Sequence, residues 1–466
     1  MFRKDRQLRS FTSSALWIPF CWLGIIGSRP VSYWFGGGDS SDDDLGGNPI
    51  NTVIFGVLTI GAIVVLQRRN FEWARFFRSN KALLAIYLFF AISTVWSPLG
   101  IVALKRLFKD FGTVLVGLVL LTEQDPLAAI RIVFVRVSYL LFPLSALVIK
   151  YYPAIGRAMS HDGFPMFTGL TTQKNTLGET VVVFGLMILW DLLELWKASD
   201  AKWWKTEMLI RYGLLAMGLW LLHECDSVTS IMCLMVGVFV FWAGGHLARM
   251  PNRRMVLAGS LLVVLCLAGL NGTFQIFDRI TEAFGRNPTL TDRTFIWHDV
   301  LVQHTNPLVG CGFYSFWDSS AGKSADELIG VSLNEAHNGY LEIYLDGGWV
   351  GVALLAVLLL AAGARAINRM FTGSYLGRLA FIFWIIAIIY NNSESDYFML
   401  GSIWFTFLLL IVEYTPQIQE AEEPAQALET AELSAHAQGP SPHVDGLSRP
   451  AAFFQRQLDN NWVSDE

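Results

Sequence analysis

Apolar blocks of membrane-spanning length recur along this chain, and they most constrain what it can fold into. Each holds roughly 15–20 residues, about the length that crosses a ~30 Å hydrocarbon layer as a helix. We find about twelve such blocks. They lie near 13–28, 50–67, 82–97, 107–121, 132–149, 178–196, 209–223, 228–244, 254–270, 347–364, 378–391 and 398–413. Only 16% of the residues are charged, against about 25% in soluble domains. The sequence therefore predicts an all-α, polytopic membrane helix bundle with about twelve transmembrane helices.

The loops between the blocks alternate in charge, which indicates their side of the membrane. Basic loops fall on every second side; they read "RKDRQLR", "QRRNFEWARFFRSNK", "KASDAKWWKTEMLIR", "GHLARMPNRR" and "ARAINRMFTGSYLGR". Loops rich in Lys and Arg face the cytoplasm in most membrane proteins. We therefore expect both termini to be cytoplasmic and the remaining loops to face outward.

Composition divides the chain into three parts. Residues 1–12 are predicted to form a short cytoplasmic N-terminus, and 13–413 the membrane domain. The tail 414–466 is rich in Glu, Ala, Gln, Pro and Ser, so we expect it to be a disordered cytoplasmic segment. One large outward loop, 271–346, interrupts the membrane domain and is expected to contain short amphipathic helices.

A histidine precedes the tenth block, in the outward segment "NEAHNGYLEIYLDGG". Its spacing predicts a short helix that begins after Asn334 and breaks at Gly347-Gly348. Because histidine titrates near neutral pH, His337 can take a proton from a hydroxyl group, and the neighbouring Asn338 is a further polar group that can position a ligand. The alternative is an interfacial anchor in which aromatic rings hold the helix and the histidine is merely solvated.

An arginine opens a second predicted helix in the same loop, within "TLTDRTFIWHDVLVQHTNP". Arg293 would lie in the first turn, where a cation opposes the helix dipole. That position favours a role in binding an anion, which both the arginine and the helix N-terminus would contact. The alternative is a structural ion pair with Asp292 or Asp299.

Two further outward segments carry polar residues beside a span. Lys174 and Asn175 stand in "GLTTQKNTLG", and Glu394 stands in the short turn "NNSESDY". Taken singly, the lysine can snorkel to the interface and the glutamate can be solvated. Taken with Arg293 and His337, they indicate a site for an anionic lipid headgroup, because arginine donates two parallel hydrogen bonds to phosphate.

The acidic run "DSSDDDLGG" is the one conceivable metal site in the sequence. Oxygen-rich clusters bind Mg²⁺ or Mn²⁺, but glycine and serine surround Asp42–Asp44, which favours a solvated loop. We therefore expect a site that uses neither a metal nor a cofactor.

Four of these segments, in order, resemble motifs of the O-antigen ligase and polymerase superfamily. They are "GLTTQKNTLG", "LTDRTFIWHDVL…NPLVGCGFYSFW", "EAHNGYLEIYLDGGWVGVALL" and "NNSESDYFMLGSIWFTFLL". The resemblance covers about 80–413 and is greatest to exopolysaccharide-production (Wzy-type) polymerases. It maps the family's essential loop arginine and histidine onto Arg293 and His337. The Lys-Asn pair and late glutamate fall on Lys174, Asn175 and Glu394. The family often has Thr-Gly-Arg where this chain has Thr-Asp-Arg, and His where it has Gln173.

The resemblance implies a GT-C-like, metal-independent membrane glycosyltransferase in the bacterial inner membrane. It would join undecaprenyl-diphosphate-linked oligosaccharide repeat units into exopolysaccharide on the periplasmic face, with inversion at the anomeric carbon. Such polymerases work beside a flippase and a chain-length regulator; no nucleic acid is involved. Two other functions stay open at this point. One is a ligase that transfers the glycan to lipid A core or protein, and the other is a transporter of lipid-linked sugars, which the scarcity of ionisable residues within the spans disfavours.

Overall fold

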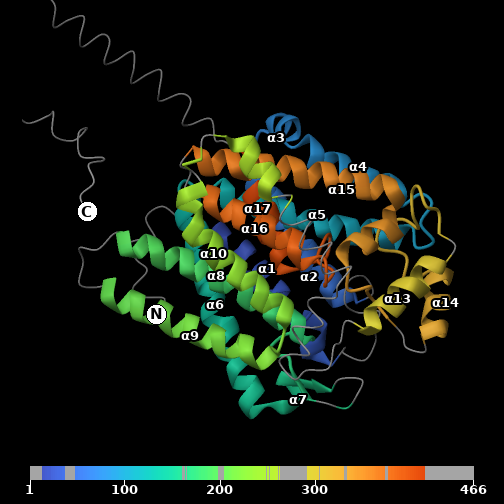
Figure 1. Ribbon diagram of the computed structural model, residues 1–466, viewed down its shortest axis with the longest axis horizontal. Coiled ribbons are helices and arrows are strands. Elements are labelled where there is room, and N and C mark those ends of the chain that lie inside the picture. Colours follow the sequence, from blue (N-terminus) through green and yellow to red (C-terminus); the bar gives the residue numbers. More distant parts are fainter. Residues whose placement is uncertain are drawn as a thin grey trace, which may run out of the picture. The chain divides into compact units, whose positions relative to one another are not determined.

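The structure, a computed structural model, consists of long helices lying side by side (Figure 1). It describes residues 13–36, 48–159, 163, 165–197, 204–247, 249–250, 252–260, 262, 291–303, 305–329, 333–372 and 376–414. The N-terminus 1–12, the acidic run at Asp42–Asp44, most of the predicted span 254–270, the first part of the outward loop and the tail 415–466 lie outside the described residues.

Helices account for nearly all described elements, as the sequence predicts. In chain order the elements are η2 (Ser14–Leu16), α1 (Trp17–Ile26), η3 (Val31–Phe35), α2 (Pro49–Arg68), α3 (Trp73–Ser79), α4 (Lys81–Ser93), α5 (Ile101–Leu121), α6 (Pro126–Tyr151), α7 (Pro153–Gly156), β1 (Arg157–Met159), β2 (Pro165–Phe167), α8 (Lys174–Lys197), α9 (Trp204–Cys225), α10 (Val228–Leu247), α13 (Thr291–Val302), α14 (Ser320–Ile329), α15 (Gly339–Phe371), α16 (Gly377–Tyr390) and α17 (Ser402–Ile411). The two short strands pair antiparallel.

Eleven of the predicted spans coincide with helices or apolar helical segments, but fewer meet a strict test for a span. Among the described residues, α2, α6, α8 and α15 are long and apolar enough to cross a membrane, and α3 with α4, bent by 95°, would make a fifth. Shorter apolar helices lie at Ser14–Ile26, Val228–Gly244, Gly377–Tyr390 and Ser402–Ile411. The chain is therefore an all-α membrane protein, while the number twelve stays a prediction.

Local sequence explains where two of the long helices begin. Asn48 caps α2 by accepting from the Ile50 N–H over 2.9 Å, and Asp125 caps α6 by accepting from the Ala128 N–H over 3.0 Å. A proline follows each cap, at the first helical position, where its missing N–H is not needed. Cap and proline together fix where these two spans begin.

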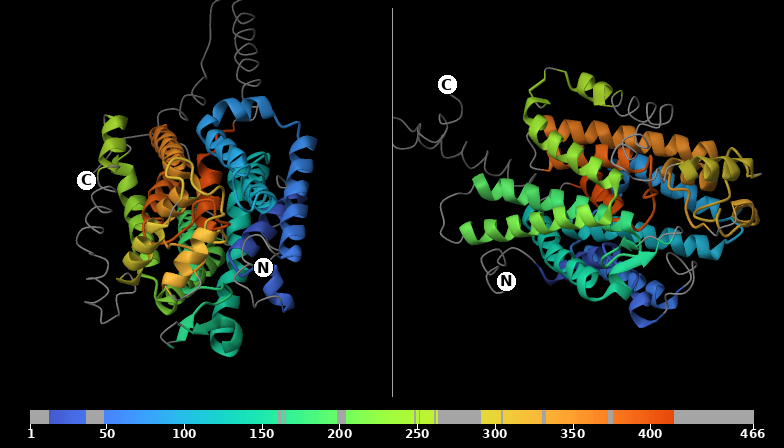
Figure 2. Two further views of the ribbon diagram at one scale, coloured as in Figure 1. Left: turned by 90° about the vertical axis from the view of Figure 1, so that its right-hand side faces the viewer. Right: turned by 60° about the horizontal axis from the view of Figure 1, so that its bottom comes forward.

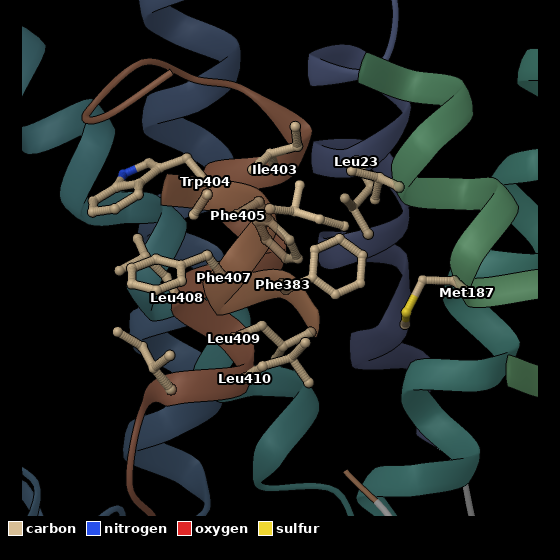
Figure 3. Close-up of a cluster of buried hydrophobic side chains, with 14 of the residues drawn as sticks. Leu23, Met187, Phe383, Ile403, Trp404, Phe405, Phe407, Leu408, Leu409 and Leu410 are labelled. Carbon is tan, nitrogen blue, oxygen red and sulfur yellow. The ribbon is translucent and has the colours of Figure 1, made fainter. Parts of the chain in front are cut away.

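The centre of the bundle is formed by α16 and α17, whose side chains are almost all buried. Phe405 of α17 lies among Phe383 of α16, Leu23 of α1 and Met187 of α8 (Figure 3). The outer helices instead leave large apolar side chains exposed, for example Val57 of α2, Leu219 of α9 and Phe239 of α10. In water such a surface would be unfavourable, so the pattern fits a lipid surrounding.

The predicted break at Gly347-Gly348 is present and is stabilised by the outward loop. Gly348 has φ +59 inside α15, a backbone conformation that glycine adopts at little cost. The carbonyls freed at Leu345 and Asp346 accept from the N–H groups of Cys311 and Gly312, over 2.9 and 2.8 Å. Non-helical backbone at the edge of a membrane is tolerated where protein groups satisfy it in this way.

The Asp346 side chain fastens the same loop to α15. Its carboxylate accepts from the backbone N–H groups of Tyr314, Ser315 and Phe316, over 2.6, 3.1 and 3.3 Å. Helices α13 and α14 lie at this end of the bundle in all views (Figures 1 and 2). The loop is thus a folded cover over one end of the bundle, and the candidate site lies beneath it.

Candidate functional site

Glu394, in the short loop between α16 and α17, contacts three of the predicted site residues. The Asn175 side chain, at the start of α8, donates to Glu394 Oε1 over 2.8 Å. Arg293 Nη2, in the first turn of α13, donates to the same oxygen over 3.1 Å. His337 Nδ1, just before α15, lies 3.3 Å from Oε2. Residues 219, 101 and 57 positions away thus meet at one carboxylate; we call these four residues the Glu394 cluster.

The loop that carries Glu394 is folded around the side chain of Asn391. Asn391 Oδ1 accepts from the N–H groups of Asp396 and Tyr397, over 2.9 and 3.0 Å. This closure turns the Glu394 carboxylate inward, where it is only 5% exposed. The alternative of a solvated glutamate is therefore wrong: the carboxylate is buried against Arg293 and His337.

His337 reaches Glu394 through an unusual backbone conformation. Its φ is +50, a region that costs a side-chain-bearing residue about 1–3 kcal/mol unless surrounding contacts impose it. Two residues later, the Gly339 N–H donates to the carbonyls of both Asn391 and Glu394, each over 3.0 Å. A Cβ at Gly339 would lie 2.0 Å from Asn391 Oδ1. The close approach of two loops therefore sets the direction of the imidazole.

Asn338 caps the helix that the sequence had predicted to begin after Asn334. Asn338 Oδ1 accepts from the N–H groups of Tyr340 and Leu341, both over 3.1 Å, and its own N–H donates to Ser395 Oγ over 3.1 Å. The prediction for Asn334 is wrong because the left-handed backbone just before Asn338 prevents an earlier start. The binding role predicted for Asn338 stays a prediction, now resting on the side-chain NH₂ group.

The charges in the Glu394 cluster raise one pKa and lower another. Burial lowers the pKa of the His337 imidazole, but the carboxylates of Glu335 and Glu394 raise it by more, so that it lies above the ordinary value. Burial raises the pKa of Glu394, yet the Arg293 guanidinium and His337 outweigh it and hold that pKa below its usual range. Glu394 is thus ionised at neutral pH and stabilises a proton on His337.

Arg293 contacts the loop between α16 and α17 rather than Asp299, one of the two partners that the sequence offers as alternatives. Its guanidinium donates to the Ser393 carbonyl and to Glu394, and 11% of its side chain is exposed. Asp299 instead contacts His298, and the side chain of Asp292 lies outside the described residues. An arginine has five N–H donors, so two contacts leave donors for an anion.

Lys174 lies beside the Glu394 cluster without joining it. It opens α8, one residue before Asn175, and its side chain is half-buried. No described residue forms a hydrogen bond or ion pair with its ammonium group. A cation at this position is available to an anion, as the sequence predicts, although no contact in the structure tests that role.

Sequence reasoning missed Glu335, which lies closer to His337 than Glu394 does. Glu335 Oε1 is 3.1 Å from His337 Nδ1, so two carboxylates face the same ring nitrogen. The only signal was its place two residues before the histidine in "NEAHN". Because Nδ1 faces carboxylates, a neutral His337 ring carries its proton on Nδ1 and its lone pair on Nε2. A general base is oriented in this way by a carboxylate that accepts from its other nitrogen.

No group of three or more His, Cys, Asp or Glu side chains is placed to hold a metal ion within the part of the chain that the structure describes. Asp42–Asp44 lies outside that part. The cluster itself offers proton transfer at His337 and anion binding at Arg293.

Comparison with known proteins places these residues in a known context. Residues 213–356, which include Arg293 and His337, match the family described as O-Antigen ligase. The chain is 27% identical over 228 residues to the exopolysaccharide production protein ExoQ of Rhizobium meliloti (strain 1021), covering 45% of this chain and 48% of the relative. The chain thus spans about half the length of the curated relative it matches. The resemblance inferred from the four motifs is confirmed.

Proposed function

Because residues 213–356 match the O-antigen ligase family and the chain is similar to an exopolysaccharide production protein, we propose that it polymerises oligosaccharide repeat units carried on undecaprenyl diphosphate. The reaction would take place at the end of the bundle that the outward loop covers, on the periplasmic face of a bacterial inner membrane. A flippase is one proposed partner, because the repeat units must first reach that face, and a chain-length regulator is the other, because it would limit the number of units joined.

The proposed step is a direct displacement at the anomeric carbon of the donor glycan. A hydroxyl oxygen of the acceptor repeat unit forms a bond to that carbon, while the bond from the carbon to the diphosphate oxygen breaks. The hydroxyl proton passes to Nε2 of His337, and the electron pair leaves on undecaprenyl diphosphate. Arg293 and Lys174 would stabilise the departing charge. One displacement inverts the configuration at the carbon.

The single observation that carries the proposal is the shared carboxylate of Glu394. It lies 3.1 Å from Arg293 Nη2 and 3.3 Å from His337 Nδ1, and so fixes the anion-binding group and the base relative to each other. Such fixed placement of reacting groups is a large part of catalysis. A solvated histidine or an anchoring arginine would not need it.

Ligation to another acceptor, such as lipid A core or protein, is the second candidate, and the description of the matched family favours it. Both reactions use the same donor and base, so the site does not separate them. The products do.

The test incubates purified full-length protein with a defined lipid-linked repeat unit, alone and with a second acceptor, either lipid A core or protein. Polymerisation predicts a ladder of lipid-linked chains without the second acceptor. A single transfer that requires it would establish the ligase instead, and no transfer in either mixture would end the glycosyltransferase proposal.

A further inference from the structure

A cavity of about 170 Å³ lies next to the Glu394 cluster. Its lining comes from α1, α2, the start of α8, the outward loop and the loop before α17, and includes Glu335, Ser395 and Asp396. Glu335 also faces His337 Nδ1 at 3.1 Å, and Ser395 accepts from the Asn338 N–H. The cavity is therefore continuous with the groups assigned to catalysis, yet neither Arg293 nor Lys174 lines it.

Asp396 is a buried carboxyl group in this lining, and one of its oxygens, Oδ2, has no hydrogen-bond partner among the described residues. The residue is 2% exposed. Its backbone is fixed, since its N–H donates to Asn391. Gly401 leaves room for the carboxylate, because a Cβ there would lie 1.7 Å from Asp396 Oδ1. A buried carboxylate oxygen without a donor is unfavourable, so a ligand that donates a hydrogen bond would be stabilised here.

A second buried carboxylate, Glu179, lines the same cavity. Its Oε1 accepts from Ser402 Oγ and from the Ile403 N–H, both over 2.9 Å, so its position is set by the start of α17. With Glu335, three acidic side chains face one small space. Burial and the neighbouring Glu179 raise the pKa of Asp396, so the cavity need not carry three charges. Among the described residues, its lining offers a diphosphate no cation and offers sugar hydroxyl groups several hydrogen-bond partners.

We propose that this cavity binds a sugar of the acceptor glycan, with Asp396 accepting hydrogen bonds from its hydroxyl groups. The inference rests on the proposed function and divides the site in two. The donor diphosphate lies on the side of Arg293 and Lys174, and the acceptor sugar enters the acidic cavity. Glu335 stands at the boundary, where it faces both the cavity and the base that takes the acceptor's proton.

The first test measures binding, independently of transfer. The probe is the repeat-unit oligosaccharide released from the host's lipid-linked intermediates and converted to its octyl glycoside, which lacks phosphate and can serve only as acceptor. Asp396→Asn should raise the Kd of this probe roughly tenfold, because the NH₂ group that replaces one carboxyl oxygen cannot accept a hydrogen bond from the sugar. The Kd of undecaprenyl diphosphate should stay within about twofold.

Two further variants protect the test against misfolding and general effects. Thr176→Trp fills the cavity from α8 and should weaken probe binding even if Asp396→Asn does not fold. Glu123→Gln removes a buried carboxylate far from the cavity and should leave probe binding unchanged. Wild-type affinity in both Asp396→Asn and Thr176→Trp would overturn the proposal. So would probe binding by the wild type that requires added Mg²⁺ or Na⁺, since the cavity would then be a cation site.

The second test measures transfer from the lipid-linked donor to the octyl glycoside. Asp396→Asn should raise the KM for the glycoside by the same factor and leave the KM for the donor unchanged. A raised donor KM with normal glycoside KM would overturn the assignment. If the wild type binds the glycoside through Asp396 but transfers nothing to it, the proposed function fails while the sugar site stands.

Discussion

Two buried carboxylates, Glu394 and Glu123, stand at opposite ends of the bundle and hold different kinds of partners. Glu123 follows the end of α5, whose 21 residues span about 30 Å, whereas Arg106 near the start of α5 contacts the outward loop at Asp318. Glu123 accepts from the N–H and the hydroxyl of Ser13, over 3.1 and 2.6 Å, and pairs with Arg69. It joins the ends of three helical segments.

The Glu394 cluster requires a less favourable backbone conformation than the Glu123 end and carries groups that can transfer a proton or bind an anion. It includes a histidine in a left-handed backbone conformation and an arginine with unused donors. An acidic cavity adjoins it. Both ends bury a carboxylate, so burial alone does not mark function. What distinguishes the outward end is a titratable base and an anion-binding group fixed to the same carboxylate.

The largest expected difference between the two ends is in transfer activity. His337→Ala and Arg293→Ala should each lower the rate about 10²–10⁴-fold, the usual contribution of a general base or of a group that stabilises developing charge. Arg69→Ala, at the Glu123 end, should leave the rate per folded molecule unchanged. Rates are measured with purified, correctly inserted protein; near-normal transfer by His337→Ala would remove the base from the mechanism.

The next difference separates catalysis from stability by changing the two carboxylates alike. Glu394→Gln and Glu123→Gln should both lower the thermal midpoint of unfolding, because each leaves a half-buried arginine without its counter-charge. Only Glu394→Gln should also lower transfer, by roughly tenfold to hundredfold. Equal loss of transfer in the two variants would show that Glu394 acts only as a brace.

A smaller effect is expected from Arg293→Lys, which keeps the charge and loses the planar fork. The KM for the donor should rise roughly tenfold, since one hydrogen bond to phosphate of about 1–1.5 kcal/mol is lost. The matched change Arg69→Lys should not affect donor KM. An unchanged donor KM in Arg293→Lys would mean that the arginine does not contact the diphosphate.

The smallest effect is a shift in pH dependence. His337 acts as a base only when neutral, and its pKa is raised by Glu335 and Glu394. The acid limb of kcat/KM should therefore lie above about 6.5, the ordinary value for histidine. Glu335→Gln removes one of these carboxylates, so the limb should move to lower pH. A limb that stays in place would assign it to another group.

Sequence reasoning identified the members of the Glu394 cluster because each lies beside an apolar block on the same predicted side. It did not show that Glu394 connects them, since its partners are up to 219 positions away and a short polar turn looks solvated when read locally. The break at Gly348 was predictable, because two glycines before an apolar run favour one. The cap at Asn338 was not, because loop contacts to Gly339, rather than local spacing, decide which asparagine begins the helix.

Glu335 and Asp396 were missed for a related reason. Each is an ordinary acidic residue in a polar stretch, and only folding places one at 3.1 Å from His337 Nδ1 and buries the other at the cavity. Hydropathy located the apolar helices but not where they end: after the break at Gly348, α15 continues to Phe371, whereas the predicted block ends at residue 364.

The proposed reaction requires the Glu394 cluster to face the outside of the cell, and labelling of introduced cysteines tests this directly. Ser320→Cys lies on the outward loop and Gln67→Cys at the far end of α2; both positions are exposed. A membrane-impermeant maleimide should label Ser320→Cys in intact cells, and Gln67→Cys only after permeabilisation, with the wild type as background. The reverse pattern would place Arg293 and His337 in the cytoplasm and contradict the proposed reaction.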